Sequence, residues 1–304
     1  IATCNHWHCL AAVWACQAGK DVYCEKPLSH ALWEGRQLIA AAREHNRVVA
    51  VGTQQRSDPL QAEVKDFLHD QRALGAIKSV VVARFGVRAS IGKRAEPLPP
   101  PAPRAYTRWL GPPQDEPIYR DQFHYDWHWS WNTGNGECGN WGVHLLDDVV
   151  NVVFRDQHKL PERIAAGGAR MAWNDAGQTP NMQFAYIEAG DVPALFALSN
   201  LPAVPGADPP KPLRFGQVET GYVVLCEGGT YYGRRGGGSA VDSDGQAIRE
   251  FKGNSGAGHM RNFLDAVRAR DPKMLNASVE IGHSSAGWAH AINAAYRAAA
   301  AQHE

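Results

Sequence analysis

Short strand-like runs alternate with helical segments over residues 1–57, and this alternation limits the fold more than any other feature of the sequence. Apolar or β-branched runs lie at 21–24 and 47–51, and helical spacing of apolar residues covers 5–18 and 29–45. A helix between two strands returns the chain to the same end of a sheet, so the strands run parallel. We therefore expect an α/β unit, in which Ile1 to Thr3 forms one further strand.

The rest of the chain has a different pattern, because strand-like runs follow one another with few helices between them. A strand is expected at 77–85, a proline-rich irregular loop at 92–120 and a helix at 143–154. Five more strand-like runs follow, at 163–170, 182–189, 193–200, 219–226 and 229–233. Helical patterns at 258–270 and 278–300 close the chain. The expected fold class is α/β plus α+β: a partial parallel-sheet domain, followed by a domain with a large, mostly antiparallel open sheet.

Composition excludes several classes of protein. Lys and Arg together number 31, as do Asp and Glu, so the sequence has no basic excess for binding nucleic acid. No apolar run reaches the roughly 18 residues that a membrane-spanning helix needs. Six cysteines occur without a Cys-x-x-Cys pair, and His6 and His8 would point to different faces of a helix. We therefore predict free structural thiols, no metal site, no membrane span and no nucleic-acid partner.

Polar residues follow three consecutive predicted strands, at the edge where an open parallel sheet binds ligands. They are Thr3, Asn5 and His6 after the first run, Glu25-Lys26-Pro27 after the second, and Gln54 and Arg56 after the third. An ammonium group on such a loop can reach a cofactor or a substrate, and the proline fixes the backbone beside it. The alternative is a surface lysine, with Thr3 and Asn5 acting as ordinary helix caps.

A glycine-rich segment, 134–142, precedes the helix predicted at 143–154, and glycine allows a ligand to approach the backbone closely. Asn140 and His144 are four residues apart, so they would stack on one face as the helix begins. Imidazole is a common general base at neutral pH, which makes His144 a candidate catalytic residue. The alternative is a histidine whose ring is satisfied inside a core helix.

Four aromatic or imidazole side chains cluster just before the glycines: His124, Trp127, His128 and Trp129. Flat rings with polar edges suit sugars, so these four residues are predicted to bind substrate, together with Arg56. The alternative for the four rings is hydrophobic packing within a long loop.

Several of these motifs resemble the Gfo/Idh/MocA family, the relatives of glucose–fructose oxidoreductase and inositol dehydrogenase. The motifs are Thr3-Cys4-Asn5-His6-Trp7-His8, Ala18-Gly19-Lys20-Asp21-Val22-Tyr23-Cys24-Glu25-Lys26-Pro27, Val51-Gly52-Thr53-Gln54-Gln55-Arg56-Ser57, Trp109-Leu110-Gly111-Pro112, Gly139-Asn140-Trp141-Gly142-Val143-His144-Leu145-Leu146-Asp147 and Glu280-Ile281-Gly282-His283-Ser284-Ser285. The similarity covers nearly the whole chain, and the later motifs especially resemble a bacterial subgroup in which exported members are common. It implies that residues 1–57 are the C-terminal half of a dinucleotide-binding Rossmann domain. Residues 58–304 would form an α+β domain for substrate binding and oligomerisation.

The resemblance also implies a cofactor, NAD or NADP, and roles for individual residues. Lys26 corresponds to the family's lysine near the nicotinamide, and His144 to its acid/base histidine. The cofactor side would comprise Thr3, Asn5, His6, Glu25, Lys26, Pro27 and Gln54. Asn140, a third catalytic residue, stands where many members have Asp. An amide can orient His144, but it cannot raise the pKa of the imidazole as a carboxylate would.

The implied activity is NAD(P)-dependent oxidation of a secondary hydroxyl of a sugar, cyclitol or sugar derivative, or reduction of the ketone. Two alternatives stay open: an NAD-dependent glycoside-cleaving enzyme that oxidises its sugar transiently, and a non-catalytic sugar- or cofactor-binding protein. The family's glycine fingerprint would lie before Ile1, so we expect a truncated chain that binds NAD(H) weakly and is inactive alone. A homo-oligomer through the C-terminal sheet is expected, in the cytoplasm or the periplasm.

Overall fold

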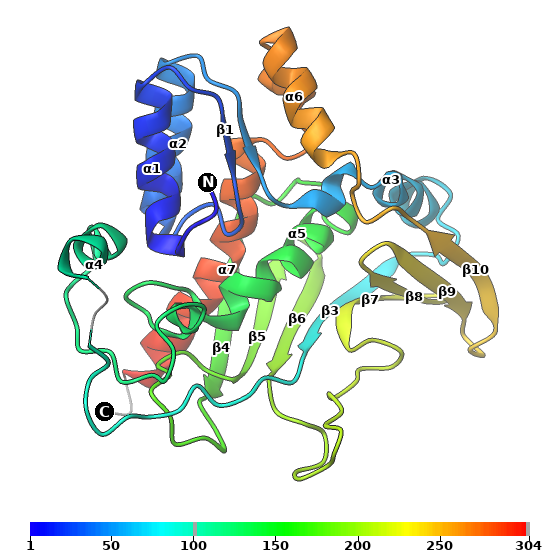
Figure 1. The fold of residues 1–304 in the computed structure, drawn as a ribbon. Coiled ribbons are helices and arrows are strands. Elements are labelled where there is room, and N and C mark those ends of the chain that lie inside the picture. The colour runs from blue at the N-terminus through cyan, green and yellow to red at the C-terminus, as the bar shows by residue number, and fades with distance from the viewer. Residues whose placement is uncertain (100–101, 302–304) are drawn as a thin grey trace.

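The parallel unit is built on β1 (Val22–Cys24) and β2 (Val49–Val51), which pair in parallel with Val22 opposite Val49. The two helices α1 (Asn5–Gln17) and α2 (Leu32–Glu44) pack against each other beside this sheet, as the blue ribbons in Figure 1 show. The computed structural model describes residues 1–99 and 102–301. Within these residues the predicted strand–helix–strand unit is confirmed.

The strand expected from Ile1 to Thr3 is not formed as a ladder, and that prediction is wrong. Ile1 alone joins the sheet: its ammonium group donates to the carbonyl oxygen of Tyr23 at 2.6 Å, and its carbonyl accepts from the N–H of Glu25 at 2.9 Å. The chain turns into α1 four residues later, which leaves too little extended backbone for further pairing.

The second sheet has eight strands within the described residues, in the order β10-β9-β8-β7-β3-β6-β5-β4. The strands are β3 (Ile77–Phe85), β4 (Arg163–Ala169), β5 (Met182–Ala189), β6 (Val192–Ser199), β7 (Thr220–Cys226), β8 (Gly229–Arg234), β9 (Gly237–Asp242) and β10 (Ala247–Lys252). β3 and β6 run parallel, and the other neighbouring pairs run antiparallel. The large, mostly antiparallel sheet is therefore confirmed, with β9 and β10 added to the strands that the sequence predicted.

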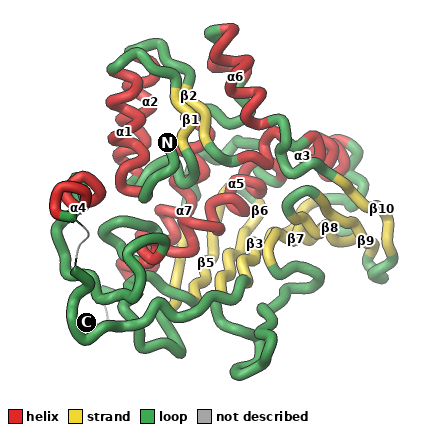
Figure 2. The backbone as a smooth tube through the Cα atoms, in the orientation of Figure 1, coloured by secondary structure: helices red, strands yellow, loops and turns green. Residues whose placement is uncertain are grey.

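The remaining helices lie around the two sheets. They are α3 (Pro59–Lys65), α4 (Pro103–Leu110), α5 (Val143–Val152), α6 (His259–Ala269) and α7 (Val279–Ala300), with the short turns η1 (Gln54–Ser57), η2 (Asp66–Asp70), η3 (Asp126–Trp129), η4 (Cys138–Gly142) and η5 (Pro272–Met274). The loop expected at 92–120 contains α4, so it is not irregular throughout; Pro100 and Pro101 of that loop lie outside the described residues. Figure 2 shows long loop segments on either side of α4.

The main core lies between the inner face of the large sheet and two helices, α5 and α7 (Figure 1). Leu145 and Leu146 of α5 and Trp288 of α7 are fully buried there, against strand residues such as Ile187 and Phe196. Burial of apolar side chains on this scale is the main stabilising contribution of such a core. α5 is thereby fixed firmly at the sheet, and it begins directly after the glycine-rich segment.

The last two helices also pack against the parallel unit. Val279 and Ala286 of α7 belong to the apolar cluster of α1, α2, β1 and β2, and Ala266 of α6 packs with Val48 and Ala50. The division into residues 1–57 and 58–304 remains a proposal. We add to it that α6 and α7 supply part of the core of the first unit.

The outer face of the large sheet carries exposed apolar side chains. Phe184, Tyr186 and Leu195 on β5 and β6 are 63%, 41% and 48% exposed, respectively. Pairs on adjacent strands place Tyr186 directly beside Leu195. These side chains form one patch, which we call the outer sheet patch. No helix in the described residues is long and apolar enough to cross a membrane.

Candidate functional site

The residue that follows β1, Lys26, reaches the glycine-rich segment that precedes α5. Its Nζ donates to the backbone carbonyl oxygen of Asn140 at 2.6 Å and to Asn140 Oδ1 at 3.0 Å. These two residues are separated by 114 positions in the chain, so tertiary folding alone brings them together. A lysine at the carboxyl end of a parallel strand is thus joined to the start of the helix that carries His144.

A pocket of about 200 Å³ opens beside this contact. It is lined by Thr3, Asn5, Glu25, Lys26, Trp127, His128 and Asn140, among others. Residues predicted for the cofactor side and residues predicted for the substrate side therefore border the same cavity. One side of the cavity comes from the strand ends of the parallel unit, and the other from the loops that precede α5.

His144 lies on the first turn of α5, four residues after Asn140, and it is buried. Its ring makes no hydrogen bond to any of the described residues; it contacts the Trp141 ring edge-on, with 5.9 Å between the centroids. Burial holds the pKa of the imidazole well below its ordinary value of 6.5, and the charges of Lys26 and Arg235 lower it further. His144 is therefore neutral at pH 7 and has a nitrogen available to accept a proton.

The segment that carries Asn140, Cys138–Gly142, is a π-helical turn rather than the first turn of an ordinary helix. Such turns are rare, and they occur often at functional sites because they displace side chains from regular α-helical positions. Here the turn presents both the side-chain and the main-chain oxygen of Asn140 to the ammonium group of Lys26. The sequence predicted that Asn140 and His144 stack on one face of a regular helix. Because Asn140 lies in the π-helical turn and His144 in α5, this regular stacking does not apply.

The ammonium group of Lys26 is held in largely desolvated surroundings. Burial lowers the pKa of Lys26 from its ordinary value of 10.5, whereas the carboxylates of Glu25 and Glu137 raise it and two arginines, Arg235 and Arg88, lower it. The two carboxylates thus oppose the loss of the charge that burial favours. A desolvated cation is a stronger electrostatic partner for a nearby anion than an exposed one.

Sequence reasoning assigned no role to Glu137, Arg84, Arg88 and Arg235, which surround this centre. Glu137 forms ion pairs with Arg84 at 2.6 Å and with Arg88 at 3.2 Å, and Arg235 Nη2 donates to Gln54 Oε1 at 3.5 Å. The position of Glu137 inside the glycine-rich segment was the one available signal, because a carboxylate among glycines beside a buried helix start needs a partner.

Two of the residues predicted for the cofactor side, Asn5 and His6, are used to join the two parts of the chain. Asn5 Nδ2 donates to Asn135 Oδ1 at 3.0 Å. The ring nitrogens of His6 face the carbonyl oxygens of Thr133 and Trp109, each at 3.2 Å. Both side chains are buried, and their contacts fix the loops that border the pocket.

The other predicted cofactor-side residues stay near the pocket. Thr3, Glu25 and Pro27 line it directly. Gln54 lies next to Glu25, since its Nε2 donates to Glu25 Oε1 at 3.5 Å. These positions agree with a ligand that extends along the carboxyl edge of β1 and β2.

Arg56, which the sequence predicted to bind substrate, forms ion pairs with two carboxylates instead. Its guanidinium group pairs with Asp147 at 2.7 Å and with Asp156 at 2.8 Å, and the Arg56 side chain is only 3% exposed. Because both edges of the guanidinium already face carboxylates, it has no free donor edge for a ligand. We correct the prediction: Arg56 is a structural residue that ties η1 to α5.

The four rings predicted to bind substrate do not line one common pocket. Trp127 and His128 line the pocket beside Lys26, with their rings stacked 3.6 Å apart. His124 lies with Trp127 in an adjoining hollow of about 470 Å³. Trp129 does not line the Lys26 pocket, although it belongs to the same 3₁₀ turn. Of the four predicted rings, Trp127 and His128 therefore border the Lys26 pocket.

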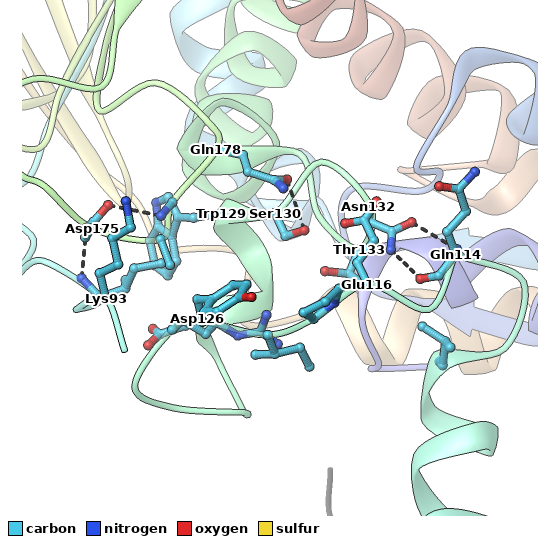
Figure 3. Close-up of a pocket in the computed structure, with 18 of the residues that line it drawn as sticks. Lys93, Gln114, Glu116, Asp126, Trp129, Ser130, Asn132, Thr133, Asp175 and Gln178 are labelled. Carbon is cyan, nitrogen blue, oxygen red and sulfur yellow. Dashed lines mark hydrogen bonds between the residues drawn. The ribbon is translucent and has the colours of Figure 1, made fainter. Parts of the chain in front are cut away.

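Trp129 lines a separate polar pocket of about 290 Å³, shown in Figure 3. Gln178 Oε1 accepts from Ser130 Oγ at 3.2 Å, and Asn132 Nδ2 donates to the carbonyl oxygen of Gln114 at 2.7 Å. These contacts hold the loops on both sides of η3 in place. The polar pocket contains none of the Lys26, Asn140 or His144 side chains.

No cluster of His, Cys, Asp or Glu in residues 1–99 and 102–301 is arranged to hold a metal ion. The six cysteines are free thiols, and all except Cys226 are buried.

Comparison with known proteins bears on the fold and on the first part of the chain. Residues 1–53 match the sequence model of an oxidoreductase family with an NAD-binding Rossmann fold. The chain is 37% identical over 79 residues to a levoglucosan dehydrogenase from Pseudarthrobacter phenanthrenivorans. That match covers 26% of this chain and 20% of the relative, so it spans about a fifth of the relative's length. The match of residues 1–53 to an NAD-binding family confirms the predicted class of cofactor, NAD or NADP.

Solved structures extend the similarity of the fold to almost the whole chain. An inositol dehydrogenase homologue from Azotobacter vinelandii, in complex with NADH and myo-inositol, superposes with a TM-score of 0.66 at 18% identity, over 98% of this chain and 75% of that one. The WlbA dehydrogenase from Bordetella pertussis, in complex with NADH and UDP-GlcNAcA, gives a TM-score of 0.66 at 17% identity, over 97% and 75%. Residues 1–53 thus match the family model of the Gfo/Idh/MocA oxidoreductases, and the solved structures share the fold over almost the whole chain.

Proposed function

We propose that the protein interconverts a secondary hydroxyl group and a ketone of a sugar, cyclitol or sugar derivative, with NAD or NADP as the oxidant or reductant. The observation that carries this proposal is that Lys26 and Asn140 are joined beside one pocket, while a neutral, unpaired His144 begins the next helix within electrostatic range of Lys26. A partly desolvated cation and a free base within electrostatic range of each other suit alcohol oxidation, because an oxygen must lose a proton while negative charge builds on it.

The chain's own residues divide the chemistry as follows. Lys26 stabilises negative charge on the substrate oxygen, and Asn140 holds the ammonium group in place through its two oxygens. His144 accepts the hydroxyl proton during oxidation and returns it during reduction. NAD or NADP, when bound, would supply the hydride acceptor for oxidation or the hydride donor for reduction. Trp127 and His128 shield the pocket and offer a ring face to the substrate.

The residues at the edge of the parallel unit fit the nicotinamide end of such a cofactor. The fit rests on the pocket itself, which runs from Thr3 past Glu25 to Lys26 at the carboxyl end of β1. In open parallel sheets this edge is where dinucleotides bind. We propose that Thr3, Glu25, Pro27 and Gln54 contact the cofactor, and that Asn5 and His6 support them from behind.

The relatives suggest the substrate class. Their names refer to levoglucosan, myo-inositol and a UDP-linked sugar acid, which are all sugars, sugar derivatives or cyclitols. A panel of such compounds, offered to the full-length protein with NAD⁺ or NADP⁺, should include at least one that yields NADH or NADPH. Release of a free sugar from a glycoside without net NADH would favour glycoside cleavage. Binding without any turnover would favour a non-catalytic protein.

The pH dependence tests the role of His144. Asn140→Asp places a carboxylate near the imidazole and raises the pKa of His144, because an opposite charge favours the protonated ring. A base must be deprotonated to act, so the acid limb of the kcat/KM profile for oxidation should move to higher pH. His144→Ala should lower kcat and remove this limb. The profile is measured with one substrate from the panel. An acid limb unchanged by both substitutions would contradict the assignment.

We also propose that the protein forms homo-oligomers through the outer sheet patch. Contiguous exposed apolar side chains on one sheet face commonly mark a protein interface. Leu195→Glu buries a charge at such an interface and should convert the oligomer to a monomer in light-scattering measurements. Ile248→Glu, which introduces the same charge at an exposed apolar position of β10, serves as the control and should leave the mass unchanged. A wild-type monomer at high concentration would refute this proposal.

A further inference from the structure

The carboxylate of Glu137 lies directly behind Asn140 and is completely buried. Arg84 of β3 donates to it through Nε at 2.9 Å and Nη2 at 2.6 Å, and Arg88 donates from the segment that follows β3 at 3.2 Å. Its second oxygen, Oε2, accepts from Asn140 Nδ2 at 3.2 Å. The large sheet is thus connected to the side chain that holds Lys26 through a single carboxylate.

This contact decides which way the Asn140 amide faces. With Nδ2 donated to Glu137, the amide oxygen is turned to Lys26, whose Nζ donates to it at 3.0 Å. The flipped amide would direct its N–H group toward an ammonium group and its oxygen toward a carboxylate. Both of those contacts are repulsive, so the carboxylate selects one orientation.

Glu137 is also part of the charge balance around Lys26. The ammonium group faces the carboxylate of Glu25 on its own loop and that of Glu137 from η4, and it faces the guanidinium groups of Arg88 and Arg235. Three imidazoles lie within electrostatic range: His8 of α1, His128 of η3 and His144 of α5. Burial lowers the pKa of each imidazole below 6.5, so near neutral pH the two carboxylates carry the negative charge that favours the protonated lysine.

We propose that Glu137 is a positioning residue for Lys26: acting through Asn140, it fixes the place of the ammonium group, and its buried charge keeps that group protonated. The inference rests on the proposed function for its catalytic meaning. The inference itself concerns the protonation of Lys26, which can be measured without any substrate.

Replacement of Glu137 by Gln keeps the size of the side chain and removes the charge. The midpoint of Lys26 deprotonation should then fall by about one pH unit, as is typical when one nearby opposite charge is lost. The midpoint is read from the pH dependence of lysine acylation with acetic anhydride, resolved peptide by peptide by mass spectrometry. Exposed Lys78, which pairs with Glu227 on the surface, is the internal reference and should not change.

Two further variants separate charge from general damage. Glu137→Asp keeps the charge on a shorter side chain and should restore most of the midpoint. Asp175→Asn is the matched control, because Asp175 is another fully buried carboxylate paired with an arginine, Arg170, and it is not among the charges around Lys26. An unchanged Lys26 midpoint in Glu137→Gln would overturn the proposal, and so would an equal fall in Asp175→Asn.

Glu137→Gln leaves two arginines without their carboxylate, so this variant could fail to fold. A second variant, for which the Lys26 midpoint is expected to rise instead of fall, keeps the proposal testable in that case. Arg88→Gln removes a cation that faces both Glu137 and Lys26, and the Arg88 side chain is only partly buried. It should raise the Lys26 midpoint while the circular dichroism spectrum stays that of the wild type; the spectrum is needed because unfolding would expose Lys26 and also raise its midpoint. A fall in the midpoint in this variant would count against the proposal. Absence of turnover with every sugar would refute the proposed function and leave this titration result unaffected.

Discussion

Replacement of Lys26 by Met is expected to lower kcat about a hundredfold or more, as is typical when a stabiliser of developing oxyanion charge is removed. Methionine keeps most of the length and the apolar stem of lysine but has no charge. The ammonium group matters most when the substrate oxygen becomes anionic, and less while the neutral alcohol and the cofactor are bound. The dissociation constant for NAD(H) should therefore change much less than kcat.

The measurement is steady-state kinetics of the full-length protein with the best substrate of the panel, together with calorimetric titration of NAD(H). Lys65→Met is the matched control, because Lys65 Nζ also donates to an asparagine side chain, Asn151 Oδ1 at 3.1 Å, away from the pocket. That variant should keep near wild-type kcat. Equal losses of NAD(H) affinity and kcat in Lys26→Met would show that Lys26 serves cofactor binding rather than the chemical step.

Much of the fold was accessible from the sequence because it depends on local pattern. The parallel pair β1 and β2 follows from two short apolar runs with a helix between them, and the large sheet follows from a series of alternating runs. Helix starts were less predictable. α2 was expected to begin after Ser29, but it begins at Leu32, because the Glu34 carboxylate accepts from the N–H groups of His30 and Ala31. Several polar residues compete for that role, and the packing of the helix selects one.

The same distinction applies to the candidate site: features within one segment were predictable from the sequence, and contacts between distant segments were not. Lys26 and Asn140 were selected from local features, a strand end and a glycine-rich segment, and the structure joins them. Which side chains lie beyond them depends on contacts between distant segments. Arg56 illustrates this limit: a strand end predicted a ligand contact, whereas Asp147, 91 residues later in the chain, occupies its guanidinium group. A pattern within one segment carries no information about such a partner.

The pair of Arg56 and Asp147 leads to the largest expected effect on stability. Arg56→Met should lower the free energy of unfolding by about 3 to 5 kcal/mol, the usual cost of leaving one member of a buried ion pair alone. Asp147 is 1% exposed, and its remaining partner besides the arginine is the hydroxyl group of Ser285. Arg43→Met is the control: Arg43 and Glu280 are 70% and 45% exposed, so the loss should be about 0 to 1 kcal/mol. Denaturant unfolding measures both variants.

The cost of Arg56→Met should depend on pH in a defined direction. Burial already raises the pKa of Asp147 above 3.8 although Arg56 opposes this, so removal of Arg56 raises it further. The folded variant then holds a proton on Asp147 at pH values where the unfolded chain has lost it. Stability therefore falls as the pH rises from the unfolded pKa to the folded pKa. The deficit relative to wild type should be smaller at mildly acidic pH than at pH 8.

Addition of Asp147→Asn to Arg56→Met should recover much of the lost stability and remove this pH dependence, because no unpaired buried charge remains at residue 147. If the double variant is as unstable as Arg56→Met at every pH, the cost comes from lost packing of the arginine stem instead. In that case Arg56 would stabilise the junction of η1 and α5 by contact area rather than by charge.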